Sequence, residues 1–314
     1  MAGVLDTVNQ RTQLVGENRL ELLLFRLVGE QIYGINVFKV KEVLQCPKLT
    51  MIPQRHPVVR GVAHIRGGTI PILDMGMATG QRAIPENEVE QCFVIITEYN
   101  RKTQGFLVKG VERIVNMNWG EIHPPPKGAG RESYLTAVTQ LDNKLVEIID
   151  VEKILAEVAP EQHNVSQKVL GKVEQTEIPR EHKILVVDDS AVARKQIQNC
   201  MQAVGLETVT KNNGKQAYDY LKDLVKSGER ISDHILLMIS DVEMPEMDGY
   251  TLTTMCKNDP DLKELFIMLH TSLSGVFNRA MVEKVGANDF MAKFSPDELA
   301  ERVMYVIDTE IPKR

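Results

Sequence analysis

The chain has 314 residues, of which 43% are hydrophobic, and it carries a formal net charge of −6 at pH 7. A chain of this length and composition is large enough for two domains, each with its own hydrophobic core. The acidic balance and the lack of a block rich in lysine and arginine argue against a surface that binds nucleic acid.

The sequence predicts a soluble, cytoplasmic protein with reduced thiols. Residues 1–17 are polar and lack the apolar core of a signal peptide, so we interpret them as an N-terminal lead-in. No uninterrupted apolar run is long enough to span a bilayer. Four cysteines stand in apolar surroundings without C-x-x-C spacing, which favours buried free thiols over disulfides or zinc ligands.

Residues 18–157 are predicted to form a β-rich domain that opens with two strands. The apolar runs 20–28 and 32–35 indicate these strands. Residues 36–44 are expected to be helical, because Asn36 is a good N-cap and the apolar side chains after it recur at helical spacing.

The rest of this domain shows many short strand patterns separated by turn signals. Strands are expected at 61–66, 69–73, 92–98, 105–108, 111–115, 135–141 and 144–149. A two-residue hairpin loop is expected at Gly67–Gly68. Such a pattern favours antiparallel barrels over a sheet built from β-α-β units.

A faint internal repeat lies within the same domain. The segments IPILDM at 70–75 and VEIIDV at 146–151 each run from a strand into a stretch led by aspartate. Two small barrels side by side would explain this repeat. The domain shows no catalytic constellation, and its histidines are too isolated to form a metal site.

Residues 158–181 are predicted to be a linker, because polar and charged side chains dominate them and prolines stand near both ends. Val165, Val169 and Val173 nevertheless lie at helical spacing. A transient helix that docks on one of the domains is therefore an alternative for this part of the linker.

Residues 182–312 alternate between strand and helix patterns, which predicts a parallel sheet with helices on both faces. Apolar strand-like runs occur at 184–187, 235–239, 266–272 and 289–294. Between them, apolar side chains recur at the spacing of amphipathic helices.

Carboxylates follow two of these strands. Asp188 and Asp189 come after the first run, and Asp241 comes after the second. The carboxyl ends of parallel strands meet at one edge of the sheet, so the three side chains are expected to converge there. Clustered carboxylates repel one another unless a cation lies between them, and Mg²⁺ suits an all-oxygen site. With metal bound, one aspartate can act as a nucleophile toward a phosphoryl group.

The simpler interpretation is that these acids cap strand ends or helices. A D-D pair followed by a D-x-x-x-P-x-x-D-G loop favours the metal site instead. The later strands add Thr271, Ser272 and Lys293, and these hydroxyls and this ammonium are the groups that would hold the other oxygens of a phosphoaspartate.

The motifs KILVVDDS, ISDVEMPEMDG, FIMLHTS and DFMAKF, taken in order, resemble those of a response-regulator receiver domain with a flavodoxin-like, doubly wound α/β fold. The resemblance implies that Asp241 accepts a phosphoryl group. It also implies roles for the residues at the other motif positions. These are metal ligation by Asp188, Asp189, Asp241 and the backbone carbonyl of Glu243, and phosphate binding or switching by Thr271, Ser272, Lys293 and Phe290.

One position departs from the receiver pattern. The family usually has a cis proline after the lysine, whereas Phe294 follows Lys293 here. A cis bond before a residue other than proline costs about 3 kcal/mol, so a trans bond and a slightly displaced Lys293 are expected.

The stretch GVAHIRGGTIPILDM at 61–75 resembles the CheW-type coupling domain, an all-β fold of paired five-stranded barrels that links chemoreceptors to their histidine kinase. The resemblance spans residues 18–157 and implies that Arg66 binds a partner. The alternative is that Arg66 merely ends an edge strand, where a charge deters aggregation.

A coupling domain (18–157) joined by a linker (158–181) to a receiver domain (182–312) resembles the CheV-type chemotaxis coupling proteins. The resemblance implies an adaptor that is regulated by phosphorylation at Asp241 and uses Mg²⁺. Its expected partners are the cytoplasmic tips of methyl-accepting chemoreceptors and the chemotaxis histidine kinase. It would be recruited to membrane-associated receptor arrays without inserting into the membrane, and it would bind no nucleic acid.

Such a protein is not expected to be an enzyme beyond the acceptance and loss of its own phosphoryl group. A close alternative is a phosphate sink that drains phosphoryl groups from the kinase. An aspartate-nucleophile phosphatase is disfavoured, because such enzymes need D-x-D after the first strand, whereas Asp188 and Asp189 are adjacent.

Overall fold

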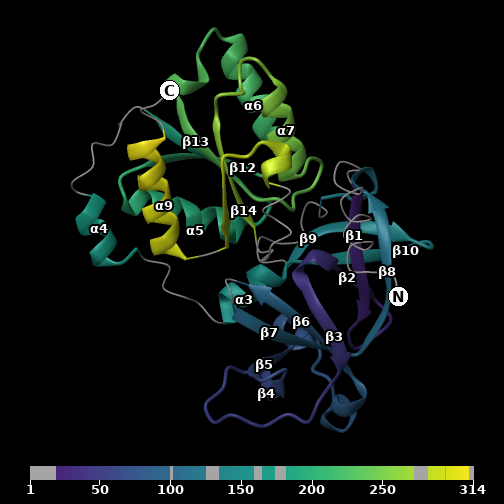
Figure 1. The fold of residues 1–314 in the computed structure, drawn as a ribbon. Helices are drawn as coiled ribbons and strands as arrows, with labels where there is room; N and C mark the ends of the chain where they lie inside the picture. Colours follow the sequence, from purple (N-terminus) through teal and green to yellow (C-terminus); the bar gives the residue numbers. More distant parts are fainter. Residues whose placement is uncertain are drawn as a thin grey trace, which may run out of the picture. The chain divides into compact units, whose positions relative to one another are not determined.

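The computed structural model describes residues 19–99, 102–124, 134–158, 165–173, 182–271, 282–293 and 295–310 (Figure 1). These residues form two compact units, one on each side of residues 159–164. Within the described part of the chain, no helix combines the length and the apolar character needed to cross a membrane. All four cysteines are buried free thiols, as predicted.

The first unit is built almost entirely of short strands. Its elements are β1 (Arg19–Arg26), β2 (Ile32–Asn36), η1 (Val37–Lys39), β3 (Val40–Gln45), β4 (Val59–Ile65), β5 (Gly68–Asp74), α2 (Met75–Ala78), η2 (Glu86–Gln91), β6 (Phe93–Tyr99), β7 (Lys102–Val108), β8 (Gly110–Asn118), η3 (Trp119–Glu121), β9 (Leu135–Leu141), β10 (Lys144–Ile149) and α3 (Val151–Val158). The prediction of an all-β domain is confirmed.

The strands form two five-stranded sheets, in the orders β8-β1-β2-β10-β9 and β3-β6-β7-β5-β4. In each sheet an isolated bridge joins the two edges. Thr50, which follows the edge strand β3, bridges to Val62 on the opposite edge strand β4, and His123, which follows β8, bridges to Val138 on β9. Each sheet therefore closes into a small barrel. The pairing is not purely antiparallel, because β2 runs parallel to β10 and β5 runs parallel to β7.

The internal repeat is confirmed by the strand registers. Ile72 pairs with Gly105 in one barrel, and Ile148 pairs with Gly34 at the corresponding place in the other. The aspartate two residues later leads into a short helix in both barrels. The carboxylate of Asp74 accepts a hydrogen bond from Met77 N, and that of Asp150 accepts one from Lys153 N. The repeated sequence is thus a strand that ends in a helix-capping aspartate.

The helix predicted over residues 36–44 is wrong. The chain makes one 3-10 turn, η1, and then continues as β3, which pairs with β6. Val40 and Leu44 are four residues apart, a spacing that fits a helix face and one side of a strand equally well. Exposure alternates from residue to residue along β3, so the period is two and the pairing partner decides the structure.

The β4–β5 hairpin loop lies one residue earlier than predicted. Ile65 pairs with Gly68, so the two loop residues are Arg66 and Gly67. Their φ angles are 49° and 82°. A two-residue hairpin loop with positive φ at both positions is a type I′ turn. Glycine adopts such φ angles freely, whereas arginine adopts them at some cost in free energy.

The second unit is an α/β layer structure. Its elements are α4 (Gln167–Val173), β11 (Lys183–Val187), α5 (Ala191–Ala203), β12 (Glu207–Lys211), α6 (Gly214–Lys226), η4 (Ile231–Asp233), β13 (Ile235–Ser240), α7 (Gly249–Asn258), β14 (Phe266–Thr271), β15 (Asp289–Ala292) and α9 (Pro296–Thr309), and residues 282–285 are also helical. The strands are all parallel, in the order β12-β11-β13-β14-β15. Helices α5 and α9 pack on one face of the sheet, and α6 and α7 pack on the other.

Two elements of this unit differ from the prediction. Strand β12, with sequence ETVTK, has no counterpart among the predicted strands because it is an edge strand without an apolar run. Residues 165–173 of the predicted linker include α4, which packs on helix α9 of the second unit. The structure thus contains the docked helix of the alternative interpretation, with Val169 of α4 and Val165, two residues before α4, buried in the same hydrophobic cluster. The other predicted linker residues, apart from Val158 at the end of α3, lie outside the described residues.

Candidate functional site

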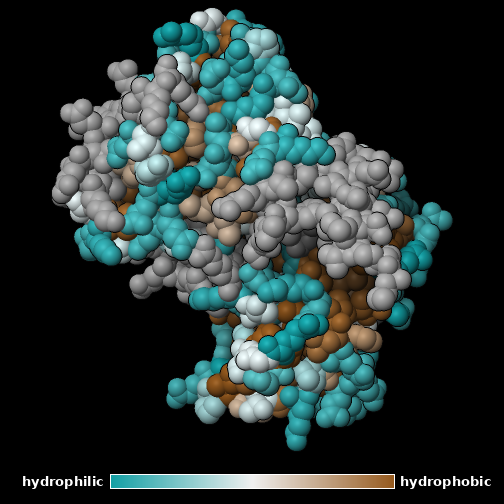
Figure 2. All heavy atoms as spheres, in the orientation of Figure 1, coloured by the Kyte–Doolittle hydropathy of each residue, from teal (hydrophilic) through white to brown (hydrophobic). Residues whose placement is uncertain are grey.

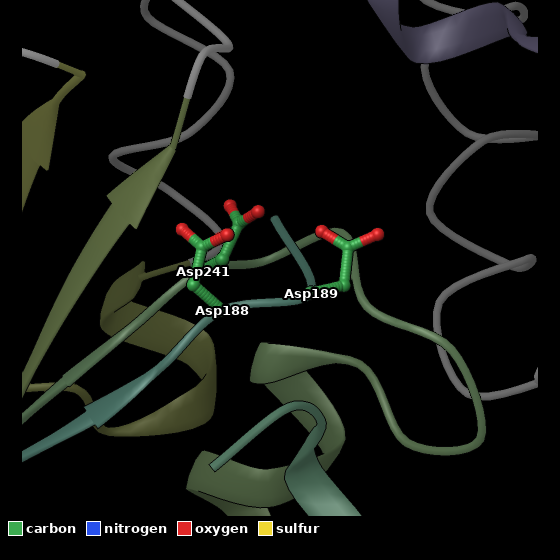
Figure 3. A group of neighbouring side chains, drawn as sticks. All are labelled: Asp188, Asp189 and Asp241. Atoms are coloured by element: carbon green, nitrogen blue, oxygen red, sulfur yellow. The ribbon is translucent and has the colours of Figure 1, made fainter. Parts of the chain in front are cut away.

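Three carboxylates meet at the carboxyl ends of neighbouring strands. Asp188 and Asp189 follow β11, and Asp241 follows β13, the strand paired with β11. One oxygen atom from each lies within 4.8 Å of the others, and Figure 3 shows the three side chains rising from these strand ends. The convergence predicted from the strand order is what the structure shows.

Backbone amides orient two of the three carboxylates. Asp188 Oδ1 accepts a hydrogen bond from Ser190 N at 2.9 Å, and Asp241 Oδ1 accepts one from Val242 N at 2.7 Å. Both side chains are buried, with exposed fractions of 1% and 6%. Charges at this depth are costly unless other charges offset them.

Lys293 supplies part of that compensation. Its Nζ atom lies 2.7 Å from Asp188 Oδ2 and 2.8 Å from Asp241 Oδ2. Its backbone N donates to the carbonyl of Thr271 at 2.8 Å, which fixes the end of β15 beside the end of β14. One ammonium among three carboxylates leaves two negative charges, which matches a divalent cation.

The donor set fits Mg²⁺. All three carboxylates offer hard oxygen atoms, and Asp189 is less buried than the other two, which leaves a side open to the waters that Mg²⁺ retains. The resemblance of the sequence motifs to a receiver domain implies the same ion. Asp188, Asp189 and Asp241 are therefore the residues that would hold the ion here.

The remaining predicted receiver residues surround this pocket to different degrees. Thr271 ends β14 and is fully buried, whereas Phe290 on β15 is half-buried against the α6–α7 side of the core. Glu243 is half-buried two residues after Asp241, and the role of its carbonyl stays a prediction. Ser272 and Phe294 lie outside the described residues, and the expected displacement of Lys293 stays a prediction.

Arg66 lies in the other unit, on the loop between β4 and β5. Its side chain is 81% exposed, and its Nε atom is 2.9 Å from both carboxylate oxygens of Glu42 on β3. The second barrel has a pair at the corresponding place, in which Arg113 on β8 contacts Asp142 in the β9–β10 turn at 2.7 Å. The two charges are exchanged between the barrels: the turn residue is the base in the first pair and the acid in the second.

Sequence reasoning missed a residue that holds the acidic loop. Arg194 on α5 donates from Nη1 to the carbonyl oxygens of Asp188 at 2.5 Å and Asp189 at 2.9 Å. The only signal in the sequence is a basic residue one turn into the helix whose N-cap is Ser190. Arg194 thereby fixes the backbone from which both acids project.

Replacing Arg194 by Gln is expected to weaken Mg²⁺ binding by about tenfold, since residues that orient metal ligands typically contribute that much to metal affinity. Isothermal titration of the full chain with Mg²⁺ measures this change. Lys195→Gln alters the next residue on the same helix, which is exposed, and is expected to bind Mg²⁺ as the wild type does. Equal affinities in the two variants would contradict the role of Arg194.

His270 is a second residue that the sequence did not single out. It precedes Thr271 on β14 and is 1% exposed. Burial, helped by the charge of Lys293, lowers the pKa of His270 from 6.5 to about 3. The imidazole is therefore neutral in the folded protein throughout the physiological range.

This shift predicts a loss of stability in acid. The unfolded chain takes up a proton at His270 near pH 6.5 while the folded chain does not, so stability is complete above that pH and falls as the pH decreases toward 3. At pH 5 the loss amounts to about 2 kcal/mol. Urea unfolding at several pH values, followed by the circular dichroism signal of the helices, should show this loss of stability. His270→Leu should remove this part of the pH dependence. The same acid profile in both proteins would contradict the prediction.

Comparisons with known proteins agree with this architecture. Residues 21–159 match the family model of the CheW-like domain, and residues 184–304 match that of the response regulator receiver domain. Chemotaxis protein CheV3 of Helicobacter pylori is 30% identical over 93% of this chain and 96% of its own length. Chemotaxis protein CheV1 of the same organism is 29% identical over 98% and 99%, respectively.

Solved structures resemble the two units separately. The scaffolding protein TtCheW from Thermoanaerobacter tengcongensis is 24% identical and covers 46% of this chain and 91% of its own, with a TM-score of 0.40. Chemotaxis response regulator CheY4 of Vibrio cholerae is 26% identical and covers 40% of this chain and 98% of its own, with a TM-score of 0.35.

A CheW-like barrel pair followed by a receiver domain defines a coupling adaptor of chemotaxis signal transduction. The full-length similarity is more specific. The chain belongs to the CheV family of chemotaxis proteins.

Proposed function

We propose that this chain couples chemoreceptors to the chemotaxis histidine kinase and that phosphorylation of Asp241 adjusts the coupling. The observation that carries the proposal is the buried pocket in which Lys293 bridges Asp188 and Asp241, with Asp189 beside them. Phosphoryl acceptance needs a carboxylate, a cation site and a fixed ammonium in this arrangement. The barrel unit supplies the surface for partners.

In the proposed reaction a phosphohistidine of the kinase is the donor. A carboxylate oxygen of Asp241 attacks the phosphorus, an O–P bond forms, the N–P bond to the imidazole breaks, and the imidazole keeps the electron pair. Bound Mg²⁺ would neutralise charge on the transferring oxygens. Lys293 already contacts Asp241 and would follow the new phosphoryl group, and the hydroxyl of Thr271 would donate to it. Phe290 would then turn inward as the surface around it rearranges.

The phosphate sink is the close alternative. A reconstituted array of receptor membranes, kinase and this protein separates the two hypotheses. If phosphorylation adjusts coupling, the receptor-stimulated rate of kinase autophosphorylation will differ between the wild type and Asp241→Asn. If the chain is only a sink, that rate will be the same with both, and only the drain of label from the kinase will differ.

The phosphatase alternative predicts turnover of small phosphoesters. We expect none, because the only chemistry that the pocket supports in this proposal is acceptance and hydrolysis of the chain's own phosphoryl group. The adjacent acids after β11 lack the spacing that a phosphatase nucleophile needs. Steady release of phosphate from a small phosphoester would favour the phosphatase.

Arg66 is proposed to contact the receptor tip or the kinase. It is strongly exposed, and the barrel unit also exposes large apolar side chains, among them Val43 and Ile114. Figure 2 shows apolar patches among hydrophilic side chains on the visible face of the molecule. Arginine is enriched in protein-binding surfaces, which combine it with apolar side chains.

Arg66→Ala is expected to raise the Kd for one of these partners by about tenfold, as truncation of an interface arginine commonly does. Calorimetry with receptor-tip fragments and with the kinase measures it. Thermal stability is expected to stay constant, because exposed ion pairs contribute little. Arg113→Ala removes the corresponding pair of the other barrel and serves as the matched control. If Arg66→Ala bound both partners with unchanged affinity, the partner-binding role would be rejected. Arg66 would then be only a charge at the end of an edge strand.

A further inference from the structure

The segment 165–173 lies between the regions that match the two family models, yet it is packed on the receiver unit. Val165 and Val169 are 6% and 3% exposed, whereas Gln167 and Lys168 face solvent. Figure 1 shows α4 beside α9. The segment therefore consists of two residues and a short amphipathic helix, α4, whose apolar side packs against the receiver unit.

The surface that it covers is on α9. The two valines belong to the same hydrophobic cluster as Leu299, Val303, Met304 and Ile307 of α9, and this cluster also contains Cys200 and Met201 of α5. Leu170 packs against this cluster as well. The apolar side of α9 is thus an intramolecular docking surface for a short helix.

A polar contact ties the same segment to the beginning of α9. Ser166 N donates to Asp297 Oδ1 at 2.7 Å, and Asp297 is in the first turn of α9. Lys293, whose ammonium bridges Asp188 and Asp241, is only four residues before Asp297 in the chain. The acidic pocket and the docked segment are consequently connected through one short stretch of backbone.

The docking contacts of the described side chains can be set against the conformational entropy of ordering the segment. Among these side chains, two buried valines, one partly buried leucine and one hydrogen bond oppose that entropy. On these described contacts the difference between the docked and undocked states is small. A modest displacement at the start of α9 is sufficient to shift such a balance.

We propose that residues 165–173 act as a latch, docked on α9 while Asp241 is unmodified and held less tightly once it is phosphorylated. The trigger rests on the proposed function, because Lys293 would follow the phosphoryl group and draw residues 293–297 away from the position in which Asp297 meets Ser166. Release adds the latch residues to the connection between the units, so the receiver can report its state to the barrels.

Hydrogen exchange of the full chain tests the docking. The amides of Val169 and Leu170 donate to Ser166 O, and they are expected to exchange much more slowly in the wild type than in Val169→Asp. Lys168→Asp introduces the same residue at the neighbouring exposed position and is expected to leave the exchange unchanged. Gly171→Ala meets no neighbouring atom, raises helix propensity and is expected to slow the exchange further. Equal exchange in wild type and Val169→Asp would overturn the proposal.

The effect of phosphorylation on the latch is tested with and without a mimic of the phosphoryl group. Mg²⁺ with beryllium fluoride, which imitates an aspartyl phosphate, is expected to speed exchange at Leu170 about tenfold, a typical coupling between two sites. Lys293→Met and Asp297→Ala are expected to speed it without any mimic. By reciprocity, Val169→Asp should bind beryllium fluoride more tightly by the same factor.

These experiments distinguish failure of the latch proposal from failure of the proposed function. Failure of beryllium fluoride to bind would count against phosphorylation of Asp241, while the two substitutions would still decide the latch. Unchanged exchange at Leu170 in both Lys293→Met and Asp297→Ala, with the amides of β13 still protected, would overturn it. Binding of the mimic without faster exchange at Leu170 would overturn it as well.

Discussion

Asp241→Asn is expected to abolish transfer of phosphoryl groups from the phosphorylated chemotaxis kinase to this protein. The amide oxygen of Asn is a poor nucleophile, and the substitution also removes one of the charges that would hold the cation. The side chain keeps its shape, and its amide oxygen can still accept from Val242 N. The amide nitrogen replaces the oxygen that accepts from Lys293, but Lys293 keeps its contact with Asp188, so we expect the fold to be preserved. Radiolabel transfer to the full chain measures the effect directly.

Two further observations make this experiment specific. Label on the wild type should be released by hydroxylamine, because an acyl phosphate is cleaved by that nucleophile. Glu246→Gln removes an exposed carboxylate from the same loop and is expected to accept label as the wild type does. Equal labelling of the wild type and Asp241→Asn would remove Asp241 from its role and the regulatory part of the proposed function with it.

The acidic pocket could be predicted from the sequence because its geometry follows from strand order alone. Buried parallel strands end at one edge of the sheet, so acids directly after β11 and β13 must be neighbours once those strands pair. Arg194 and His270 could not be predicted in this way. Their importance depends on where a helix side chain reaches and on what buries a strand residue, which are tertiary facts.

The same contrast explains the errors in the fold. Residues 36–44 were predicted as helix because Val40 and Leu44 fit both periods, and pairing with β6 settles the matter only in three dimensions. Strand β12 has little apolar signal because one of its edges is free. The parallel pairs β2–β10 and β5–β7 join strands that are not consecutive in the chain, so turn signals contain no trace of them.

Gly249→Ala is expected to disable the pocket from the opposite side of the loop. A Cβ atom at this position would lie 2.1 Å from the carbonyl oxygen of Asp241 and 3.0 Å from its carbonyl carbon. Both are backbone atoms and cannot rotate away. The glycine of the D-x-x-x-P-x-x-D-G motif is therefore required because α7 begins in direct contact with the backbone of Asp241.

The magnitudes favour a large effect. Alanine gains at most about 1 kcal/mol of helix propensity over glycine, whereas overpacking costs about 1–3 kcal/mol and sometimes more. The backbone of Asp241 must move to relieve the overlap, and a displacement near 1 Å at a reacting group lowers its rate by about a hundredfold. We expect slower labelling by the kinase, together with a lower urea concentration at the unfolding midpoint of the α/β unit.

Gly120→Ala provides the control, since a Cβ there meets no atom within 4 Å and the same chemical change should alter neither measurement. If Gly249→Ala lowered the urea midpoint but left labelling intact, the loop would have relaxed around Asp241 without disturbing its carboxylate. If it left both intact, α7 and the Asp241 loop could separate freely, and the close backbone contact would not be what positions the phosphoryl acceptor.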